Sequence, residues 1–426
     1  MKKFSTTLIL PFFLFALFFT SCDEEKVESP SNQENHALYD LLQEWYLWYD
    51  QLPEVDPAEY NNPGELLEDV RYENDYWSYI TTIEEFESYY QEGAFIGYGF
   101  GFSTDTAGNQ RILYTYENSP LASEGVERGW IIERVDGEQI TSREQLSELL
   151  GPSEAGLSNE FLLISPEGDS VEQTFTKQEM TINTVIHSSV IEHGGHLTGY
   201  MVLNGFIEKT TGEVYQVFQD FAQQNIDQLV IDLRYNGGGM LNKANEIADY
   251  IIGDEHIGDI FIQILHNDKK TDQNSYSYFQ QDSLELNTNF PALYFITSGA
   301  SASASEALIN GMKPYKDVYL IGDQTYGKPV GMYAFYDNQG YYAYVPVCFR
   351  VANANEESDY FQGIPVDVEA MDDMAVPFGS PEEDRLQQAL HHIETGTFLI
   401  QKQRFHTPDP VFESSYRREL VKTIKE

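Results

Sequence analysis

The spacing of apolar and polar residues follows three different patterns along this chain. Between residues 36 and 92, apolar and aromatic residues recur mostly at helical spacing, as in ALYDLLQEWYLWYDQLP, where Pro53 is expected to end a helix. GELLEDVRY and EEFESYYQEG predict two shorter helices in the same region. We interpret the aromatic stripe as core packing, so residues 36–92 are predicted to form a helical N-terminal region.

Residues 93–178 change to short strands separated by glycine turns. FIGYGFGFST alternates glycine with apolar residues, RILYTY predicts a strand, and SPLASEGVERGWIIERVDGEQI predicts a turn, a short helix and a further strand. Exposed backbone N–H groups beside a strand edge are suited to binding a peptide as an added strand. The residues expected to provide this edge are Tyr98, Gly99, Phe100, Gly101 and Phe102. A β-rich spacer that binds nothing is the alternative.

Residues 179–396 repeat strand and helix. QLVIDLRY, ALYFITSG and VYLIGD are continuous apolar runs, which is typical of strands buried on both faces of a sheet. TGEVYQVFQDFAQQN, LNKANEIADYII and SEALINGM predict helices, and a last helix is expected to end at Gly396. This pattern indicates an α/β domain, followed by a peripheral tail at 397–426. The whole chain is predicted to be a multidomain α/β protein.

The first residues are predicted to be a targeting segment. A pair of lysines precedes an apolar run that is too short to span a membrane. The run ends in FFTSC, which resembles the lipobox of bacterial lipoproteins, where the cysteine, here Cys22, is acylated. The resemblance implies a signal peptide at 1–21, a polar tether at 22–35 and a lipid anchor in the bacterial cell envelope. A plain secretory signal with a chance cysteine is the alternative.

Composition narrows the class of partner. The net charge is −44, from 69 acidic and 25 basic residues, so the surface repels phosphate backbones and argues against nucleic acid as a partner. The same acidity is also compatible with a salty habitat. Cys348 is the only other cysteine, so no disulfide framework within the chain is expected once Cys22 is acylated. Cys348 lies in the strand-like YAYVPVCF and is predicted to be a buried small hydrophobic residue.

Each apolar strand of the α/β domain is followed by a loop of small residues. In open α/β sheets, sites are built at the carboxyl ends of the strands. The first loop, DLRYNGGG, holds three consecutive glycines, which weaken regular structure but allow free backbone N–H groups before the next helix. Such groups bind a phosphate or a developing oxyanion. The chain has neither a GxxxxGK[ST] motif nor a dinucleotide fingerprint, which favours the oxyanion.

The second and third loops carry a candidate nucleophile and a candidate base. GASASASE contains Ser303, three residues before Glu306, which is also the spacing of a helix-capping box. Capping does not explain the small residues around Ser303, which allow a substrate to approach, as at other exposed nucleophile turns. DQTYGKPVG holds Lys328 in a glycine-flanked loop. A lysine there is usually a solvated charge, and it becomes a base only if desolvation lowers its pKa.

These three motifs resemble those of the carboxy-terminal processing peptidases, or tail-specific proteases, a family of serine peptidases with a Ser-Lys dyad. The family motifs are D-L-R-x-N-x-G-G, S-A-S-E and T-x-G-K, in the order found here. The resemblance implies that Ser303 is the nucleophile and that Lys328, 25 positions later as in the family, is the base. It implies an oxyanion hole at Ala304 and at Gly238 or Gly239, with no metal and no cofactor.

The resemblance extends over roughly residues 36 to 395 and also implies architecture and partners. The helical start is similar to that of Bacteroidetes-type members, residues 93–178 resemble the PDZ domain of the family, and the catalytic part would have a crotonase-like α/β fold. Trp130 follows Gly129, where those PDZ domains usually carry Asp. The expected partners are unfolded or C-terminal segments of envelope proteins, and a membrane reached through the lipid anchor.

One departure from the family motifs and two histidines keep other functions open. Met332 stands where many family members carry a glutamine that orients the lysine. It favours, as an alternative, a weakly active or inactive PDZ-containing peptide-binding lipoprotein. His193 and His196 are candidates for the histidine base of the tricorn-like branch, although EHGGH is interpreted as a turn with solvated side chains and is a poor metal signal. Crotonase-type chemistry on acyl-CoA thioesters, and binding of acidic glycans or cations by the charged surface, have less support.

Overall fold

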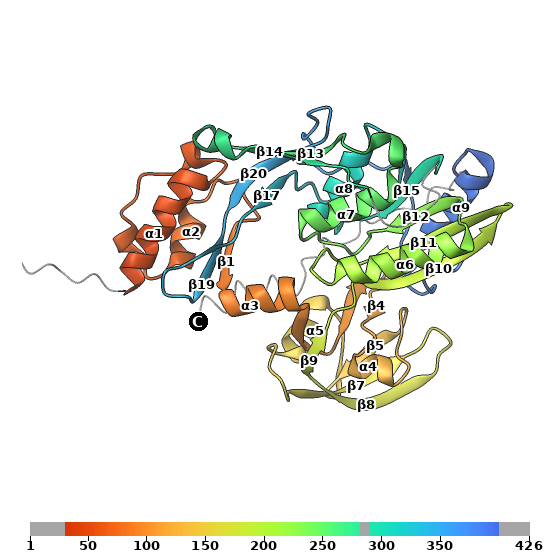
Figure 1. The fold of residues 1–426 in the computed structure, drawn as a ribbon. Helices are drawn as coiled ribbons and strands as arrows, with labels where there is room; N and C mark the ends of the chain where they lie inside the picture. Colours follow the sequence, from red (N-terminus) through yellow and green to blue (C-terminus); the bar gives the residue numbers. More distant parts are fainter. Residues whose placement is uncertain (1–29, 282–289, 400–426) are drawn as a thin grey trace, which may run out of the picture.

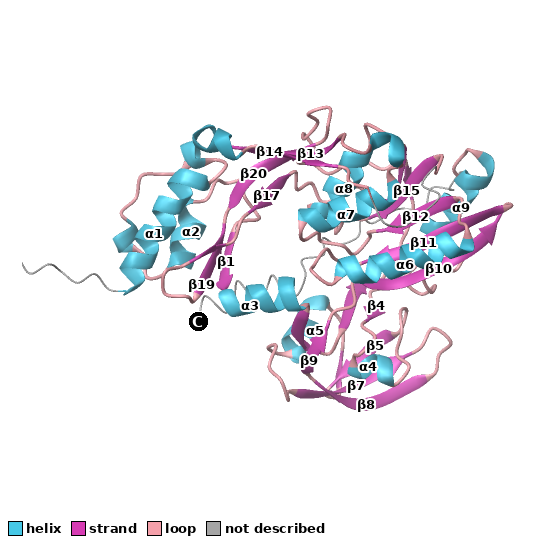
Figure 2. Cartoon of the chain, viewed as in Figure 1, coloured by secondary structure: helices cyan, strands magenta, loops and turns pink. Residues whose placement is uncertain are grey.

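The computed structural model describes residues 30–281 and 290–399, which are drawn in Figures 1 and 2. The predicted signal peptide, Cys22, most of the predicted tether and the tail beyond residue 399 lie outside the described residues. Along the described chain, N-terminal helices, a β-rich module and an α/β domain follow one another (Figure 1). In this described part, no helix is both long enough and apolar enough to cross a membrane.

The N-terminal region is helical, but its first helix is displaced from the predicted position. α1 spans Pro30–Trp45, so it begins inside the segment predicted as a tether and ends well before Pro53. Just beyond this end, Leu47 N–H donates to Val347 O at 2.9 Å, which attaches the segment to a strand from the far end of the chain. The other helical elements are the 3-10 turns Tyr49–Gln51 and Pro57–Glu59, α2 (Pro63–Val70), α3 (Ile83–Glu87) and the π turn Ser88–Glu92.

These N-terminal helices pack against strands that come much later in the chain. β1 (Tyr79–Thr82) pairs antiparallel with β19 (Tyr342–Val345), and β18 (Phe335–Tyr336) continues this small sheet. One hydrophobic cluster joins the two parts and includes Leu38, Leu42, Tyr46, Leu66, Val70, Trp77, Tyr344 and Val347. The interpretation of the N-terminal aromatic residues as core packing is confirmed for this buried set.

The first and last strands of the β-rich module, β2 (Ala94–Gly97) and β9 (Gln178–Thr181), pair with each other in antiparallel orientation. Its main sheet has the strand order β3-β4-β5-β7-β8, with β6 paired to β5, so β3 lies at an edge. The remaining bounds are β3 Phe100–Thr104, β4 Gln110–Thr115, α4 Pro120–Ser123, β5 Ile131–Val135, β6 Glu138–Gln139, α5 Arg143–Leu150, β7 Ser158–Ile164 and β8 Ser170–Thr176.

The α/β domain is built on a six-stranded sheet in the order β10-β11-β12-β15-β16-β21. β10 is antiparallel to β11, and all other neighbours are parallel. The strands are β10 Val185–His193, β11 His196–Leu203, β12 Gln228–Asp232, β15 Ala292–Thr297, β16 Asp317–Gly322 and β21 Val368–Glu369. The helices are α6 Thr210–Gln224, α7 Leu241–Ile251, α8 Ala304–Met312 and α9 Asp384–Thr395.

Side chains on the central strands alternate between two cores. Ile231 and Phe295 pack in the cluster that contains the apolar faces of α6, α7 and α8. Val230 and Ile296, their direct neighbours in the chain, pack in the cluster that contains the apolar face of α9. The sheet is therefore covered on both faces (Figure 1), which explains the continuous apolar runs in the sequence.

A second sheet, in the order β14-β13-β20-β17, connects the α/β domain to the N-terminal region. Its strands are β13 Ile260–His266, β14 Ser275–Tyr278, β17 Val330–Met332 and β20 Val347–Ala352. YAYVPVCF, predicted as one strand, is two, because Pro346 lacks the N–H that a continuing ladder needs and separates β19 from β20. Cys348 is buried as predicted, and this burial raises its pKa to about 12.

Candidate active site

Three loops at the carboxyl ends of parallel strands meet around Ser303. They follow β12, β15 and β16, and they hold the three motifs that stand out in the sequence. Ala302 N–H donates to Asn236 O at 3.1 Å, and Tyr326 N–H donates to Ser301 O at 3.0 Å. These bonds join the serine loop to the glycine loop on one side and to the lysine loop on the other.

Four serines lie in GASASASE and in the residue just before it, and three of these four hold the loops together. Ser298, Ser301 and Ser305 are buried, and each hydroxyl donates to a backbone carbonyl of the segment 233–236. The distance from Oγ to the carbonyl oxygen is 2.8 Å for Ser301 and 2.9 Å for Ser305. Ser303 differs from the other three because it is partly exposed.

Ser303 has a strained backbone conformation at the start of α8. Its φ is +58° and its ψ is −112°, a combination that residues with a side chain rarely adopt. Strain of this kind costs about 1–3 kcal/mol and persists only where the surroundings hold it. Ser303 N–H donates to Glu306 Oε2 at 2.9 Å, so the predicted S-x-x-E spacing does tie this turn to the helix.

The glycine loop lies directly against this turn. Gly238 has a φ of +98°, and a Cβ placed on it would lie 2.7 Å from Ala302 O and 2.7 Å from Ser303 Cβ, so no side chain fits. Gly239 has a φ of +138°, and a Cβ placed on it would lie even closer to the oxygen of another backbone carbonyl. Gly238 N–H donates to Asn236 Oδ1 at 2.9 Å, so it can bind an oxyanion only after Asn236 turns away.

The other expected oxyanion donor is the backbone of Ala304. Ala304 is the first residue of α8, so its N–H has no acceptor inside the helix. The Cβ position of Gly238 lies 3.0 Å from Ala304 N. The glycine backbone and the Ala304 N–H therefore border the same small volume beside Ser303.

A single buried carboxylate ties the serine turn to the lysine loop. Glu306 Oε1 accepts hydrogen bonds from Thr325 Oγ1 at 2.6 Å and from Gly327 N–H at 2.7 Å. Its Oε2 accepts from Lys328 N–H at 2.8 Å and from Ser303 N–H at 2.9 Å. Burial raises the pKa of Glu306, and the bonds it accepts act in the opposite direction. From the sequence, Glu306 was interpreted only as a cap, because its spacing to Ser303 carries no information about the lysine loop.

Lys328 is buried beside the residue that departs from the family pattern. Only 4% of Lys328 is exposed, and its Nζ lies 3.8 Å from Met332 Sδ. A thioether is a weak acceptor, so this contact is weaker than the hydrogen bond that an amide would offer. Met332 lies at the end of β17, in the sheet that runs toward the N-terminal region.

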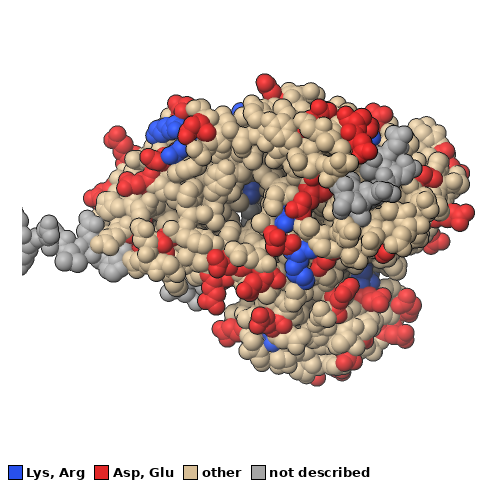
Figure 3. Space-filling model, in the orientation of Figure 1, with Lys and Arg blue, Asp and Glu red and all other residues tan. Residues whose placement is uncertain are grey.

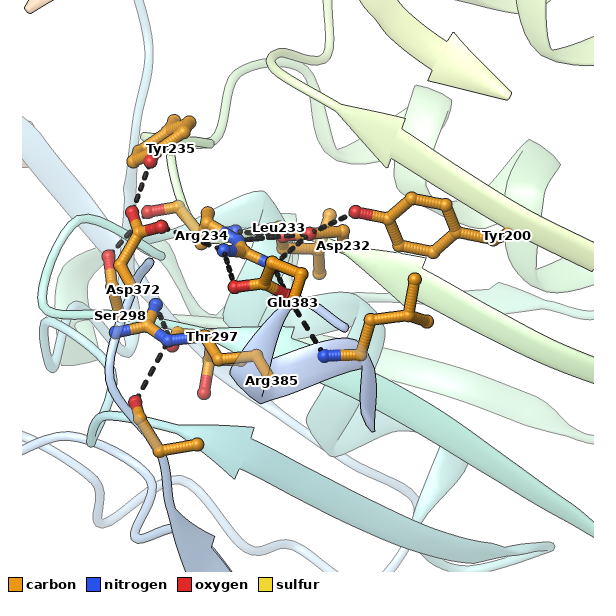
Figure 4. Close-up of polar contacts among 12 residues, drawn as sticks. Tyr200, Asp232, Leu233, Arg234, Tyr235, Thr297, Ser298, Asp372, Glu383 and Arg385 are labelled. Atoms are coloured by element: carbon orange, nitrogen blue, oxygen red, sulfur yellow. Dashed lines mark hydrogen bonds and ion pairs between the residues drawn. The ribbon is translucent and has the colours of Figure 1, made fainter. Parts of the chain in front are cut away.

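A buried ionic cluster surrounds Arg234 of the glycine loop, and Figure 4 shows Arg234 with Asp372 and Glu383. Arg234, just before the glycines, lies 2.7 Å from Glu383 and 2.9 Å from Asp372. Arg128, from the β-rich module, pairs with the same Asp372, so the cluster joins this module to the glycine loop. Burial opposes ionisation of Asp372, but the two arginines hold its pKa well below the usual range, and Arg234 also lowers the pKa of Glu383. The members of this cluster come from distant segments of the chain, so no local motif in the sequence points to it.

The predicted peptide-binding residues of the module have two different environments. The edge strand β3 contains Phe100, Gly101 and Phe102, and Gly99 precedes it with a φ of +78°. Arg143 of α5 lies over the Phe102 ring at 5.7 Å, so α5 flanks this strand. Tyr98 is buried, and its hydroxyl donates to Asn159 Oδ1. The Tyr98 side chain therefore belongs to the core of the module.

The histidines of EHGGH lie away from these loops. His193 and His196 border the turn between β10 and β11, at the end of β11 opposite to the three loops around Ser303. His193 Nε2 lies 3.2 Å from Glu394, His196 Nδ1 lies 2.9 Å from Asp227, and both histidines are partly exposed. Their interpretation as a surface turn is confirmed. Among residues 30–281 and 290–399, no three His, Cys, Asp or Glu side chains gather as a metal site.

Two parts of the chain match protein-family models. Residues 197–370 match peptidase family S41, and residues 33–79 match the peptidase S41 N-terminal domain. The chloroplastic C-terminal processing peptidase of Tetradesmus obliquus is 28% identical over 251 residues, covering 55% of this chain and 52% of that protein. Carboxy-terminal processing protease CtpB of Bacillus subtilis is 27% identical over 221 residues, covering 51% and 43%. The chain thus spans about half the length of the curated relatives it matches.

Solved structures match over a longer part of the chain. An S41-type protein from Bacteroides fragilis superposes with a TM-score of 0.69 at 24% identity, covering 84% of this chain and 97% of that one. The photosystem II D1 C-terminal processing protease superposes with a TM-score of 0.53 at 19% identity, covering 84% and 100%. At these identities the likeness establishes the fold, and the predicted multidomain α/β architecture is confirmed.

Proposed function

Because this chain belongs to peptidase family S41, we propose that it is a serine endopeptidase of the carboxy-terminal processing type, with Ser303 as nucleophile and Lys328 as base. The observation that carries the proposal is the carboxylate of Glu306, which binds the backbone N–H of both residues. Ser303 is also the partly exposed member of its serine cluster. Lys328 is buried, with only 4% of the residue exposed.

In this mechanism, Lys328 Nζ takes the proton from Ser303 Oγ, which attacks the carbonyl carbon of a peptide bond. The N–H of Ala304 and an N–H of the Gly238–Gly239 turn stabilise the oxyanion. The C–N bond then breaks, and Lys328 returns the proton to the leaving amine. Water, deprotonated by the same lysine, hydrolyses the acyl-enzyme and restores Ser303.

The substrate in this proposal is an unfolded or C-terminal segment of an envelope protein. Its tail would dock as an added strand on the outer edge of β3, which lies at the end of the described sheet order. Acylation of Cys22 would hold the enzyme at a membrane of the bacterial cell envelope. The chemistry assigned to these residues requires neither a metal nor a cofactor.

The proposal is tested with an unfolded reporter protein that ends in an apolar tail. We expect the purified chain to cleave it, and a fluorophosphonate probe to label Ser303, located by mass spectrometry of the digested protein. Replacing the apolar tail by a charged one should slow cleavage without changing probe labelling. Binding of the reporter with neither cleavage nor labelling would instead identify a peptide-binding scaffold.

The contact between Met332 and Lys328 leads to a separate prediction about how well Lys328 acts as a base. In Met332→Gln, an amide oxygen replaces the thioether and can accept a hydrogen bond from Lys328 Nζ, so kcat should rise by roughly three- to tenfold, as expected for about 1 kcal/mol. Met332→Leu is the matched control, since it keeps the volume and offers no acceptor, and its kcat should not rise. Steady-state cleavage of the reporter measures both. An equal change in the two variants would mean that the residue acts through packing alone.

A further inference from the structure

We propose that Tyr76, Trp77 and Phe361 form a binding surface for a large apolar side chain of the substrate, on the lysine side of the catalytic loops. We call these three residues the aromatic shelf. The proposal rests on the peptidase function proposed above and adds the selectivity that this function would have. The occupant is an aromatic or large aliphatic side chain of an extended polypeptide.

The shelf has two exposed rings, Tyr76 and Phe361, and each of them contacts the buried ring of Trp77. Tyr76 is 65% exposed and Phe361 is 36% exposed. The ring centroids of Trp77 and Phe361 are 6.3 Å apart, and those of Tyr76 and Trp77 are 6.2 Å apart. Single exposed apolar residues are ordinary on protein surfaces, whereas a contiguous apolar patch beside a site is typical of a binding surface.

The backbone that carries Tyr76 and Trp77 is held rigidly. The buried carboxylate of Asp75 accepts hydrogen bonds from Trp77 N–H at 2.9 Å and from Ser78 N–H at 3.0 Å. Tyr46 Oη donates to the same carboxylate at 2.7 Å. A surface fixed in this way loses little conformational entropy when a ligand binds, which favours binding.

Phe361 brings the shelf to the lysine loop. A Cβ placed on Gly327 would lie 2.5 Å from Phe361 O, so the two backbones touch one residue before Lys328. Ile364 N–H donates to Thr325 Oγ1 at 2.7 Å, which fastens the same segment to the lysine loop. The shelf is therefore built onto the loop that supplies the proposed base.

The shelf is also continuous with the side chain that contacts the lysine. Met332 and Tyr326 pack on the hydrophobic cluster that contains Trp77, and Met332 Sδ is the atom near Lys328 Nζ. Figure 3 shows the molecule hollowed between the N-terminal region and the α/β domain, with a basic side chain inside the hollow. Because the shelf adjoins the lysine loop, we place its occupant near the scissile bond of an extended substrate, which advances roughly 3.3–3.6 Å per residue.

The chemistry of the shelf selects its occupant. Its three side chains carry no charge, and aromatic rings bind other rings and large aliphatic groups by offset or edge-to-face contacts. A small or charged side chain would leave this surface in water or lose its own hydration. A second copy of this chain is the competing occupant, and the experiment separates the two.

The test uses a set of peptides that are identical except at one position, which holds Phe, Leu, Ala or Asp, and this position is moved stepwise along the peptide. With the wild-type chain, kcat/KM should favour Phe over Ala by about 10- to 100-fold at one position near the cleavage site. In Tyr76→Ala/Phe361→Ala this preference should fall below about threefold. Tyr278→Ala, which changes a tyrosine that is 42% exposed on β14, is the matched control and should keep the full preference.

Binding to Ser303→Ala separates this proposal from the proposed function. In that background, fluorescence anisotropy should show the Phe peptide binding more tightly than the Ala peptide, and the two shelf substitutions should remove the difference. This result would support the shelf even if the wild-type chain cleaved nothing. If the double variant does not fold, the single variant Tyr76→Ser, at the more exposed of the two positions, tests whether the preference for Phe over Ala is lost. An unchanged preference, or a shelf variant whose main effect in sedimentation is to dissociate a dimer, would overturn the proposal.

Discussion

Replacing Ser303 with alanine is expected to abolish peptide hydrolysis and leave the fold intact. Loss of the nucleophile should lower kcat on the order of 10⁴- to 10⁶-fold, with the residual rate supplied by the oxyanion donors and by substrate binding. The variant keeps the backbone N–H that binds Glu306, so the connection between the serine turn and the lysine loop survives. Reporter cleavage gives the rate, and thermal unfolding gives the stability.

Ser305→Ala is the matched control, because it removes the same atom two positions away. It removes one of the two hydrogen bonds to the carbonyl of Asn236, which still accepts from Ala302 N–H, so the loss should be about 0.5–1.5 kcal/mol. The unfolding midpoint should drop by a few degrees, while turnover stays within about tenfold of the wild type. Turnover lost in Ser305→Ala and kept in Ser303→Ala would refute the assignment of the nucleophile.

Asp372→Asn is expected to have the largest effect on stability. The substitution leaves Arg128 and Arg234 buried with one carboxylate fewer between them, and removing one member of a buried ion pair typically costs about 3–5 kcal/mol. The β-rich module and the glycine loop should both become less stable, since each contributes one of these arginines. Urea unfolding measures the loss as a lower midpoint.

The same carboxylates predict how stability depends on pH. The pKa values of Asp372 and Glu383 are lower in the folded chain than in the unfolded chain. Their contribution is therefore complete above the unfolded values of about 4 and is lost as the pH falls through them toward the lower folded values. The wild-type midpoint should fall steeply below about pH 4.5, and Asp372→Asn should show a shallower dependence over the same range.

Asp373→Asn controls for the change of one carboxylate to an amide at this point of the chain. Its side chain accepts a hydrogen bond from Ala375 N–H at 3.3 Å and is not one of the carboxylates that pair with Arg128 or Arg234. Its midpoint should stay close to that of the wild type at every pH. If Asp372→Asn and Asp373→Asn lowered the midpoint equally, the effect would come from the loss of one negative charge in this segment, and the buried ion pairs would add nothing to stability.

Much of the fold was predictable because it depends on local patterns. The runs QLVIDLRY, ALYFITSG and VYLIGD correspond to β12, β15 and β16, since a strand covered on both faces needs apolar residues at every position. The first helix begins earlier in the chain than predicted. Its N-terminal half is polar, so the spacing of apolar residues there gives little indication of a helix. The break at Pro346 was missed, although proline at that point argues against a continuous strand.

What the sequence by itself determined was where the loops of small residues and the candidate site residues lie along the chain. Ser303 lies in a turn of small residues, and three consecutive glycines follow another apolar run, so both features can be read from adjacent residues. Only the tertiary structure decided what these residues touch. Glu306 meets Lys328 across 22 positions, Arg128 meets Asp372 across 244, and the aromatic shelf meets the lysine loop through Phe361. Such contacts depend on how loops from different strands pack together, and no spacing within one segment encodes that packing.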